Sequence, residues 1–221
     1  MMRFLALIAF LLAGCGTMNT ARPLSPGEHV VGATFGGPMV SFAGTYIPLP
    51  NLVLEGRSGL TTLADRPLDV NYGLNATGLP FGVVGLHGGT SWLAMEQQGA
   101  RPALSIANRL YLYDNHLDRR KEVETRALWG MDQIEATVSW APGRFLLYAG
   151  VSEYLDFSSP RLLLSPFLGA EIPLGQRSRL QVQLHHFAIN QSKNLNTITW
   201  MTWGPGSIGL TLGYQRRLKG D

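Results

Sequence analysis

The sequence is poor in cysteine, in charge and in long apolar segments, and each shortage excludes a class of protein. Its 221 residues include one cysteine, so no disulfide can form within the chain. Charged residues make up 15%, below the roughly 25% of ordinary soluble domains, so a conventional water-facing surface is not expected. The net charge of +3 comes without basic clusters interleaved with aromatic residues, so no nucleic-acid partner is expected.

The N-terminus has the pattern of an export signal. Arg3 precedes an apolar run over Phe4–Ala13, which is too short to cross a bilayer as a helix and has the length of a signal-peptide core. The run ends in Leu12-Ala13-Gly14-Cys15, which resembles the lipobox of bacterial lipoproteins. The resemblance implies that residues 1–14 are removed and that Cys15 carries acyl chains, which provide stable membrane anchoring. An ordinary signal peptide with an incidental cysteine is the alternative.

Two further regions follow the signal. Residues 15–26 are small, polar and proline-containing, without periodicity, and we interpret them as a lipidated flexible tether. Residues 27–221 form one domain. By the same resemblance, the absence of aspartate at Gly16, directly after the cysteine, favours export to the bacterial outer membrane.

The domain consists of short segments in which apolar and polar residues alternate, separated by Gly, Pro and Asn. Alternation is clearest over Leu68–Asn75, and the last such segment is Ser207–Tyr214. A period of two is typical of strands with one apolar and one polar face. We expect an all-β fold, a closed antiparallel up-and-down transmembrane β-barrel of about 12 strands, with 10 as the alternative. The count of 12 includes a turn at Gly36-Gly37-Pro38 and a strand over Thr197–Trp203.

The final segment carries a second resemblance. Ser207, Gly209, Leu212 and Tyr214 occupy the positions of the closing-strand signal of bacterial outer-membrane β-barrels. In that family the last strand usually ends the chain on an aromatic residue, whereas Gln215–Asp221 follow here. The resemblance implies membrane lipid as a partner and the outer-membrane assembly machinery as a partner during biogenesis. It gives no oligomeric state.

Alternation alone does not say whether the apolar face meets lipid or an internal ligand, because a lipocalin-like soluble barrel has the same pattern inside out. The polar face is mostly Gly, Ser, Thr, Asn and Gln, which is a poor surface for a soluble protein. Aromatic residues collect near segment ends, as in the interfacial girdles of membrane barrels. Both features favour lipid outside. One feature opposes it: twelve strands place the long Asp114–Gly130 connection at the periplasmic end, where such barrels normally have short turns.

Charged residues on the polar face are mixed in sign, which predicts ion-paired filling of the barrel more than a selectivity lining. We expect a lumen-facing polar network of Glu55, Arg57, Asp69, Arg109, Glu135, Glu171, Arg179 and His185.

No complete catalytic or metal-binding pattern is found, so no enzyme activity and no cofactor are predicted. Lipid A deacylases have a histidine followed by serine two residues on and asparagine three residues on, whereas His186 is followed at those places by Ala188 and Ile189. No pair of histidines has metal-ligand spacing beside a carboxylate.

The sequence therefore predicts a lipid-anchored outer-membrane barrel with a structural, envelope-associated or passive pore role. The alternatives are a lipid-anchored soluble barrel that binds an apolar ligand and a barrel enzyme that acts on envelope lipid.

Overall fold

The computed structural model describes residues 21–42, 45–48, 51–77, 83–114, 128–157, 162–187 and 207–218. The predicted lipobox, Cys15, residues 15–20 of the tether and the expected strand over Thr197–Trp203 lie outside this part of the chain. The described residues form strands β1 (His29–Phe42), β2 (Thr45–Pro48), β3 (Asn51–Leu63), β4 (Arg66–Thr77), β5 (Val83–Met95), β6 (Ala103–Asp114), β7 (Leu128–Trp140), β8 (Leu146–Asp156), β9 (Leu162–Pro173), β10 (Ser178–Phe187) and β11 (Ser207–Leu218). No helix among them has the length and hydropathy to cross a bilayer.

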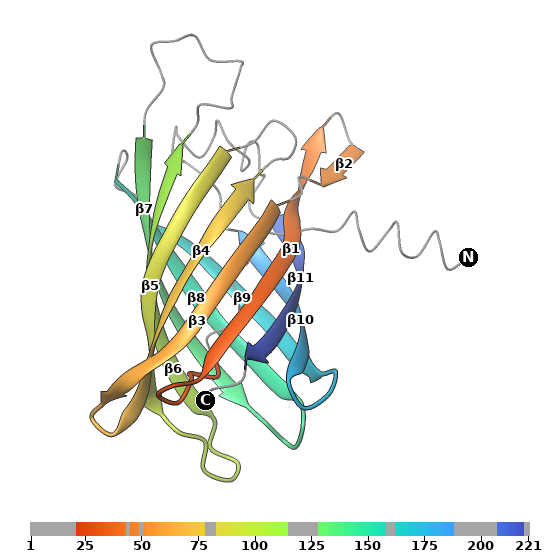
Figure 1. The fold of residues 1–221 in the computed structure, drawn as a ribbon. Helices are drawn as coiled ribbons and strands as arrows, with labels where there is room; N and C mark the ends of the chain where they lie inside the picture. The colour runs from red at the N-terminus through yellow and green to blue at the C-terminus, as the bar shows by residue number, and fades with distance from the viewer. Residues whose placement is uncertain are drawn as a thin grey trace.

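The strands form a closed antiparallel barrel (Figure 1). Each barrel strand pairs with the next along the chain, and β11 pairs with β1 to close the wall. Within the described residues ten strands make this wall, while β2 extends only the far end of β1. The predicted all-β antiparallel barrel is confirmed, and the alternative count of ten replaces the count of twelve.

The predicted turn at Gly36-Gly37-Pro38 is wrong, because β1 continues through these residues. Pro38 lacks an amide hydrogen and would interrupt a central ladder. Here Gly36, Gly37 and Pro38 pair with Thr211, Leu210 and Gly209 of β11, which keeps them in the strand. On the other side of β1, the described pairs are Gly36↔Asn51 of β3 and Met39↔Pro48 of β2. Dividing this strand in two caused part of the miscount.

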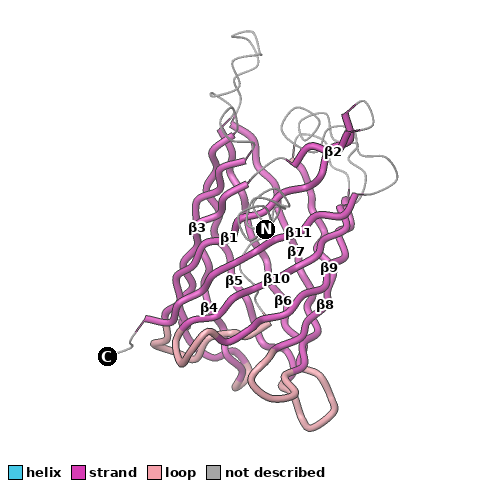
Figure 2. Tube along the Cα trace, turned by 90° about the vertical axis from the view of Figure 1, so that its right-hand side faces the viewer, coloured by secondary structure: helices cyan, strands magenta, loops and turns pink. Residues whose placement is uncertain are grey.

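The corrected count places the connections as membrane barrels normally do. Short turns join β3 to β4, β5 to β6, β7 to β8 and β9 to β10 at one end, which we call the short-turn end. The first residue of β1 and the last of β11 lie at this end too, as their pairing His29↔Leu218 requires. Figure 2 shows the described turns gathered there. The connections 115–127 and 188–206 therefore join strands at the opposite end, and the objection raised by twelve strands no longer applies.

The two faces of the wall differ in chemistry. Along β6, Ser105, Ala107, Arg109 and Tyr111 are buried, whereas Ile106, Leu110 and Leu112 are exposed. The same alternation runs along β4, β7 and β10. Because successive side chains of a strand point to opposite faces, the buried set faces the interior of the barrel and the exposed set faces outward.

Candidate functional site

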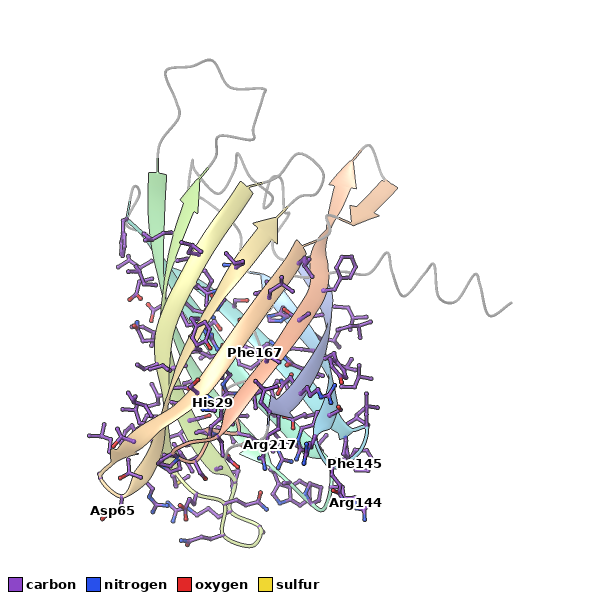
Figure 3. All side chains as sticks on the ribbon, in the orientation of Figure 1. His29, Asp65, Arg144, Phe145, Phe167 and Arg217 are labelled. Carbon is purple, nitrogen blue, oxygen red and sulfur yellow. The ribbon has the colours of Figure 1, made fainter. Side chains whose placement is uncertain are left out.

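The barrel interior holds most of the polar side chains that the sequence predicts for a lumen network. Glu55, Arg57, Asp69, Arg109, Glu135, Glu171 and His185 are buried, and Arg179 is half-buried near the short-turn end. Side chains occupy the interior together with an N-terminal segment (Figure 3). The contacts of these residues can be grouped around individual side chains.

The first group is centred on Asp69, which is completely buried. One of its carboxylate oxygens accepts hydrogen bonds from Arg57 Nε at 3.1 Å and Nη2 at 2.5 Å, and the other accepts one from the Ser91 hydroxyl. Arg57 also donates to the backbone carbonyl of Arg22 at 3.0 Å. A buried carboxylate needs this degree of compensation, because desolvation of an unpaired charge is costly.

The second group surrounds Glu135. Arg109 Nη1 lies 3.2 Å from the Glu135 carboxylate and donates to the Gln133 side chain at 3.1 Å. Tyr111 donates to the same Gln133 oxygen at 2.6 Å. Ser152 donates to Glu135 at 3.2 Å and accepts from Gln133 at 2.9 Å. Neutral polar side chains therefore hold one buried charge pair in place.

His87 belongs to a third group that the sequence analysis missed. Its Nε2 lies 3.2 Å from Glu55 Oε1, and its Nδ1 lies 3.1 Å from Asn75 Oδ1. The ring stacks at a tilt on Tyr111, with centroids 5.3 Å apart, which connects this group to the second. The glycine-rich sequence around His87 obscures the alternation. The one usable signal is the apolar neighbour Leu86: Leu86 lies on the outer face, so the ring of His87 lies on the inner face.

His185 lies in a group of amides. The Gln183 amide nitrogen is 2.7 Å from His185 Nε2, and the Gln183 oxygen accepts hydrogen bonds from Tyr148 and Gln181, each at 2.9 Å. The ring of Phe167 lies against the His185 ring, with centroids 5.9 Å apart. His186 is in β10, but its side chain lies outside the described set.

The N-terminal segment, residues 21–28, enters the barrel at the short-turn end. Ala21 is buried against Leu146, Tyr148 and Phe167, and its carbonyl accepts a hydrogen bond from Ser139 at 3.2 Å. The sequence predicts residues 15–26 as a flexible tether. Within that range Ala21 and Leu24 are buried, whereas Ser25 and Pro26 are exposed.

Gly59 of β3 makes this approach feasible. A β-carbon there would lie 1.9 Å from the carbonyl oxygen of Ser25, so any larger residue would displace the segment. Backbone hydrogen bonds from Gly27 to Gly59 and from Gly59 to Glu28, at 3.2 and 2.8 Å, fix the segment to β3.

Glu171 lies where this segment meets the wall. Its carboxylate lies 3.3 Å from Arg22 Nε and 3.0 Å from Arg179 Nε. Burial lowers the pKa of Arg22; the Glu171 carboxylate opposes that shift, and the nearby Arg179 and Arg217 guanidiniums add to it. No sequence signal marks Arg22, because it lies in an aperiodic segment.

The outer face is mainly apolar. Its exposed residues include Leu54, Leu74, Leu86, Leu110, Ile134, Val138, Leu147 and Leu168. Exposed aromatic residues lie at both ends, with Trp140 and Phe145 at the short-turn end and Phe157 at the other.

A polar stripe interrupts this apolar face. A row of cross-strand pairs runs over β5, β6, β7 and β8. Its members are Thr90, Asn108, Ile134 and Glu153, and all but Ile134 are polar. Asn108 donates a hydrogen bond to the Asp132 carboxylate at 2.8 Å. The inward neighbours of these residues are buried, so the stripe faces outward.

Another outward pair combines a base with a hydroxyl group. His29 Nδ1 lies 2.9 Å from Ser58 Oγ across the β1–β3 ladder, at the short-turn end. Both side chains are accessible, and no carboxylate among the described residues forms an ion pair with His29. The described His, Cys, Asp and Glu side chains include no group of three or more that could hold a metal ion.

In a comparison with solved structures, the chain is similar to outer membrane phospholipase A from Escherichia coli, with a TM-score of 0.44 and 11% sequence identity. The match covers 95% of this chain and 96% of that chain. No protein-family model and no curated protein matches the sequence. An identity this low transfers no catalytic residue to the chain.

Proposed function

We propose that this protein is a lipid-anchored β-barrel that spans the bacterial outer membrane and has a structural, envelope-associated role. The observation that carries the proposal is the inverted distribution of polarity, with charged and amide side chains buried inside and large apolar side chains exposed outside. In water, an exterior of this kind would expose extensive apolar surface, which is unfavourable. In the hydrocarbon of a bilayer, the same surface would carry no such cost.

Dimensions and closure support the same proposal. The barrel strands are 10 to 14 residues long, and a tilted strand needs about 9–11 residues to cross the apolar layer. Pairing of β11 with β1 leaves no open edge in the wall, as hydrocarbon requires. As part of the proposal, the assembly machinery recognises β11 during biogenesis, and the match of Ser207, Gly209, Leu212 and Tyr214 to the closing-strand signal supports this part.

The lipocalin-like alternative fits poorly. A carrier of apolar ligands needs an apolar cavity, but the largest fully buried side chains described here are Arg109, Gln181 and Glu171. These side chains also favour a filled barrel over a passive pore. Residues that line a water-filled channel are solvent-accessible, yet Arg109 and Glu171 are each 1% exposed.

The N-terminal segment is compatible with a lipid anchor at Cys15. Ala21 contacts Leu146 and Ser139, which lie at the short-turn ends of β8 and β7. Ala21 follows Cys15 by only six positions, a stretch that spans at most about 20 Å when extended. An acylated Cys15 can therefore reach the membrane surface beside the short-turn end, which would be the periplasmic end.

Carbonate extraction of membranes that contain a Cys15→Ala variant tests spanning independently of the anchor. A spanning barrel stays in the membrane pellet and migrates differently on gels before and after heating. Release of the variant into the soluble fraction would contradict the proposal and would favour a tethered soluble barrel.

Planar-bilayer recording separates the structural role from the pore role. The purified wild-type chain should insert without producing steps of conductance. Reproducible single-channel steps, absent from a mock preparation, would replace the structural role with a conducting one.

The pair His29–Ser58 favours an acyl hydrolase as the second candidate function. A histidine nitrogen within 2.9 Å of a serine hydroxyl is the minimum geometry for an activated nucleophile. A fluorophosphonate probe should label the wild-type chain but not a Ser58→Ala variant if the serine is activated. Absence of labelling in both chains would remove this candidate.

A further inference from the structure

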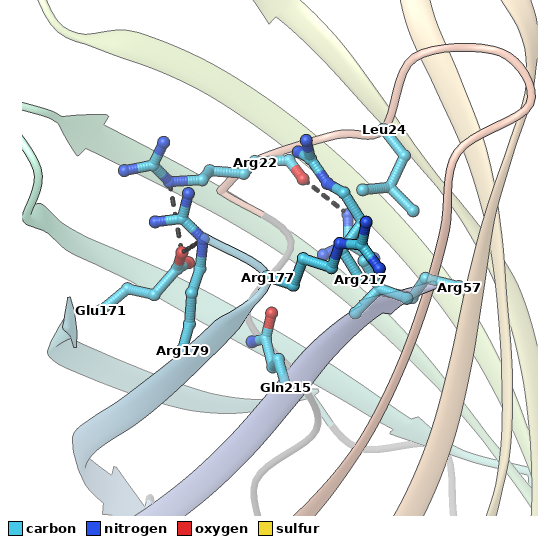
Figure 4. Close-up of a pocket in the computed structure, with 9 residues that line it drawn as sticks. Arg22, Leu24, Arg57, Glu171, Arg177, Arg179, Gln215 and Arg217 are labelled. Carbon is cyan, nitrogen blue, oxygen red and sulfur yellow. Dashed lines mark hydrogen bonds and ion pairs between the residues drawn. The ribbon is translucent and has the colours of Figure 1, made fainter. Parts of the chain in front are cut away.

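A pocket rich in arginine lies at the short-turn end of the barrel, between the N-terminal segment and strands β1, β3, β9, β10 and β11 (Figure 4). It is a small recess that is partly open to solvent. The lining includes Arg22, Arg57, Arg177, Arg179, Arg217 and Glu171.

The pocket carries more positive charge than the described residues neutralise. Arg22 and Arg179 share the Glu171 carboxylate, Arg57 pairs with Asp69, and Arg217 pairs with Glu28. Five arginines thus face three carboxylates, which leaves a surplus of two positive charges.

Several guanidinium groups in the pocket also have N–H donors without a partner among the described residues. Arg22 and Arg179 both approach Glu171 through Nε, and their terminal nitrogens have no hydrogen-bond or ion-pair partner among the described residues. Arg177 forms no side-chain ion pair or hydrogen bond within the same part of the chain. Three guanidiniums from the N-terminal segment, a turn and a strand therefore present unused donors to one pocket.

We propose that this pocket binds a divalent oxyanion, namely a phosphate group that is either free or esterified. Guanidinium groups match phosphate oxygens in geometry and donate paired hydrogen bonds to them. A phosphate monoester carries close to two negative charges near pH 7, which equals the surplus in the pocket. The proposal depends on the barrel and its N-terminal segment and does not require the membrane placement proposed above.

The phosphate group can come from a soluble compound or from a lipid headgroup, and one experiment distinguishes these sources. The full chain is folded in a nonionic detergent, which contributes no phosphate. Binding is measured by calorimetry with glycerol 3-phosphate in solution and, separately, with phosphatidic acid mixed into the micelles. Sodium chloride at equal ionic strength provides the background.

Binding of either phosphate compound above the chloride background supports the proposal and identifies the source. Affinity should increase as pH rises through about 6, where a phosphate monoester gains its second charge. No binding of either compound, or binding equal to that of chloride, would overturn the proposal.

A pair of variants tests the position of the site. Arg177→Gln should weaken binding about tenfold, as expected for loss of a charge-assisted hydrogen bond. Arg144→Gln is the matched control, because Arg144 is exposed in another turn at the same end and does not line the pocket. Both variants change exposed turn residues, and heat-dependent gel migration verifies that each barrel is folded. Equal affinities for the two variants would contradict binding in this pocket.

Discussion

At the scale of single residues, the interior contains charges whose partners come from other strands or from the N-terminal segment. Asp69 on β4 has Arg57 on β3 on one side and Ser91 on β5 on the other. Such a group tolerates removal of one member poorly, because the remaining charge stays buried without compensation.

Replacement of Asp69 by Asn tests this dependence. The variant should lower the free energy of unfolding by about 3–5 kcal/mol, because the Arg57 guanidinium loses its carboxylate within the barrel. Denaturant unfolding of chains folded in lipid vesicles provides the measurement. Asp65→Asn removes the same charge from an exposed turn and should change stability by less than about 0.5 kcal/mol. Similar losses in the two variants would contradict a special role for the buried pair.

Polar residues on the outer face of the barrel can be used to test whether that face meets lipid or water. The double variant Asn108→Leu and Asp132→Leu removes a hydrogen-bonded pair from the outer face. If that face meets hydrocarbon, stability in vesicles should rise by about 1–2 kcal/mol, since a lipid-facing carboxylate is unfavourable. Unchanged or lower stability would indicate that the stripe is covered by water or by another protein surface.

At the scale of elements, the N-terminal segment is held in place by its close approach to Gly59. Gly59→Val should displace residues 21–27, because the new side chain would overlap the Ser25 carbonyl. A cysteine introduced at Ala21 in a Cys15→Ala background reports the movement through its reaction with a water-soluble thiol reagent. The reaction should be slow with Gly59 present and at least about tenfold faster in the Gly59→Val variant, since a buried thiol is inert.

Gly88→Val is the matched control for this displacement. A β-carbon at Gly88 has no neighbour closer than 3.9 Å, so the substitution fits without moving the segment. Equal reactivity of the introduced thiol in all three backgrounds would show that Gly59 does not position the segment.

The β3–β4 turn offers a stabilising change at the same scale. Ala64 and Asp65 have φ values of 50° and 59°, the left-handed conformation of a two-residue type I′ hairpin turn. Asparagine followed by glycine suits these conformations best, so Ala64→Asn with Asp65→Gly should raise the free energy of unfolding by about 1 kcal/mol. Denaturant unfolding checks the gain, and a loss of stability would contradict the turn type.

The sequence predicted the wall of the barrel better than its contents. Alternation over Leu68–Asn75 assigned the two faces correctly, because a strand has a fixed period of two. Gly36-Gly37-Pro38 misled the strand count, because Gly and Pro are typical of turns and local sequence does not reveal that pairing with β11 continues through these residues.

The contents of the barrel depend on contacts that no local pattern encodes. His87 is in a glycine-rich segment, and Arg22 is in an aperiodic one, so neither residue could be assigned to the interior from its neighbours in sequence. Both positions follow from closure of the wall and from entry of the N-terminal segment.

At the scale of the whole molecule, the barrel reverses the polarity of a soluble protein. Closure pairs the backbone along each ladder, the most deeply buried charges are paired inside the barrel, and the exterior is left mainly apolar. All three features have the same consequence, which is that the outer surface suits lipid. In the proposed membrane placement, the arginine-rich pocket lies at the short-turn end of a wall that crosses the bilayer.

The most direct test of this account is to measure whether lipid or water surrounds individual residues of β6. The chain has one cysteine, so a Cys15→Ala background accepts single spin labels at Ile106, Ala107, Leu110 and Tyr111. In lipid vesicles, labels at Ile106 and Leu110 should be accessible to oxygen and shielded from a water-soluble nickel complex. Labels at Ala107 and Tyr111 should be shielded from both reagents. Strong accessibility of Ile106 and Leu110 to the nickel complex would place the apolar face in water and contradict a membrane-spanning barrel.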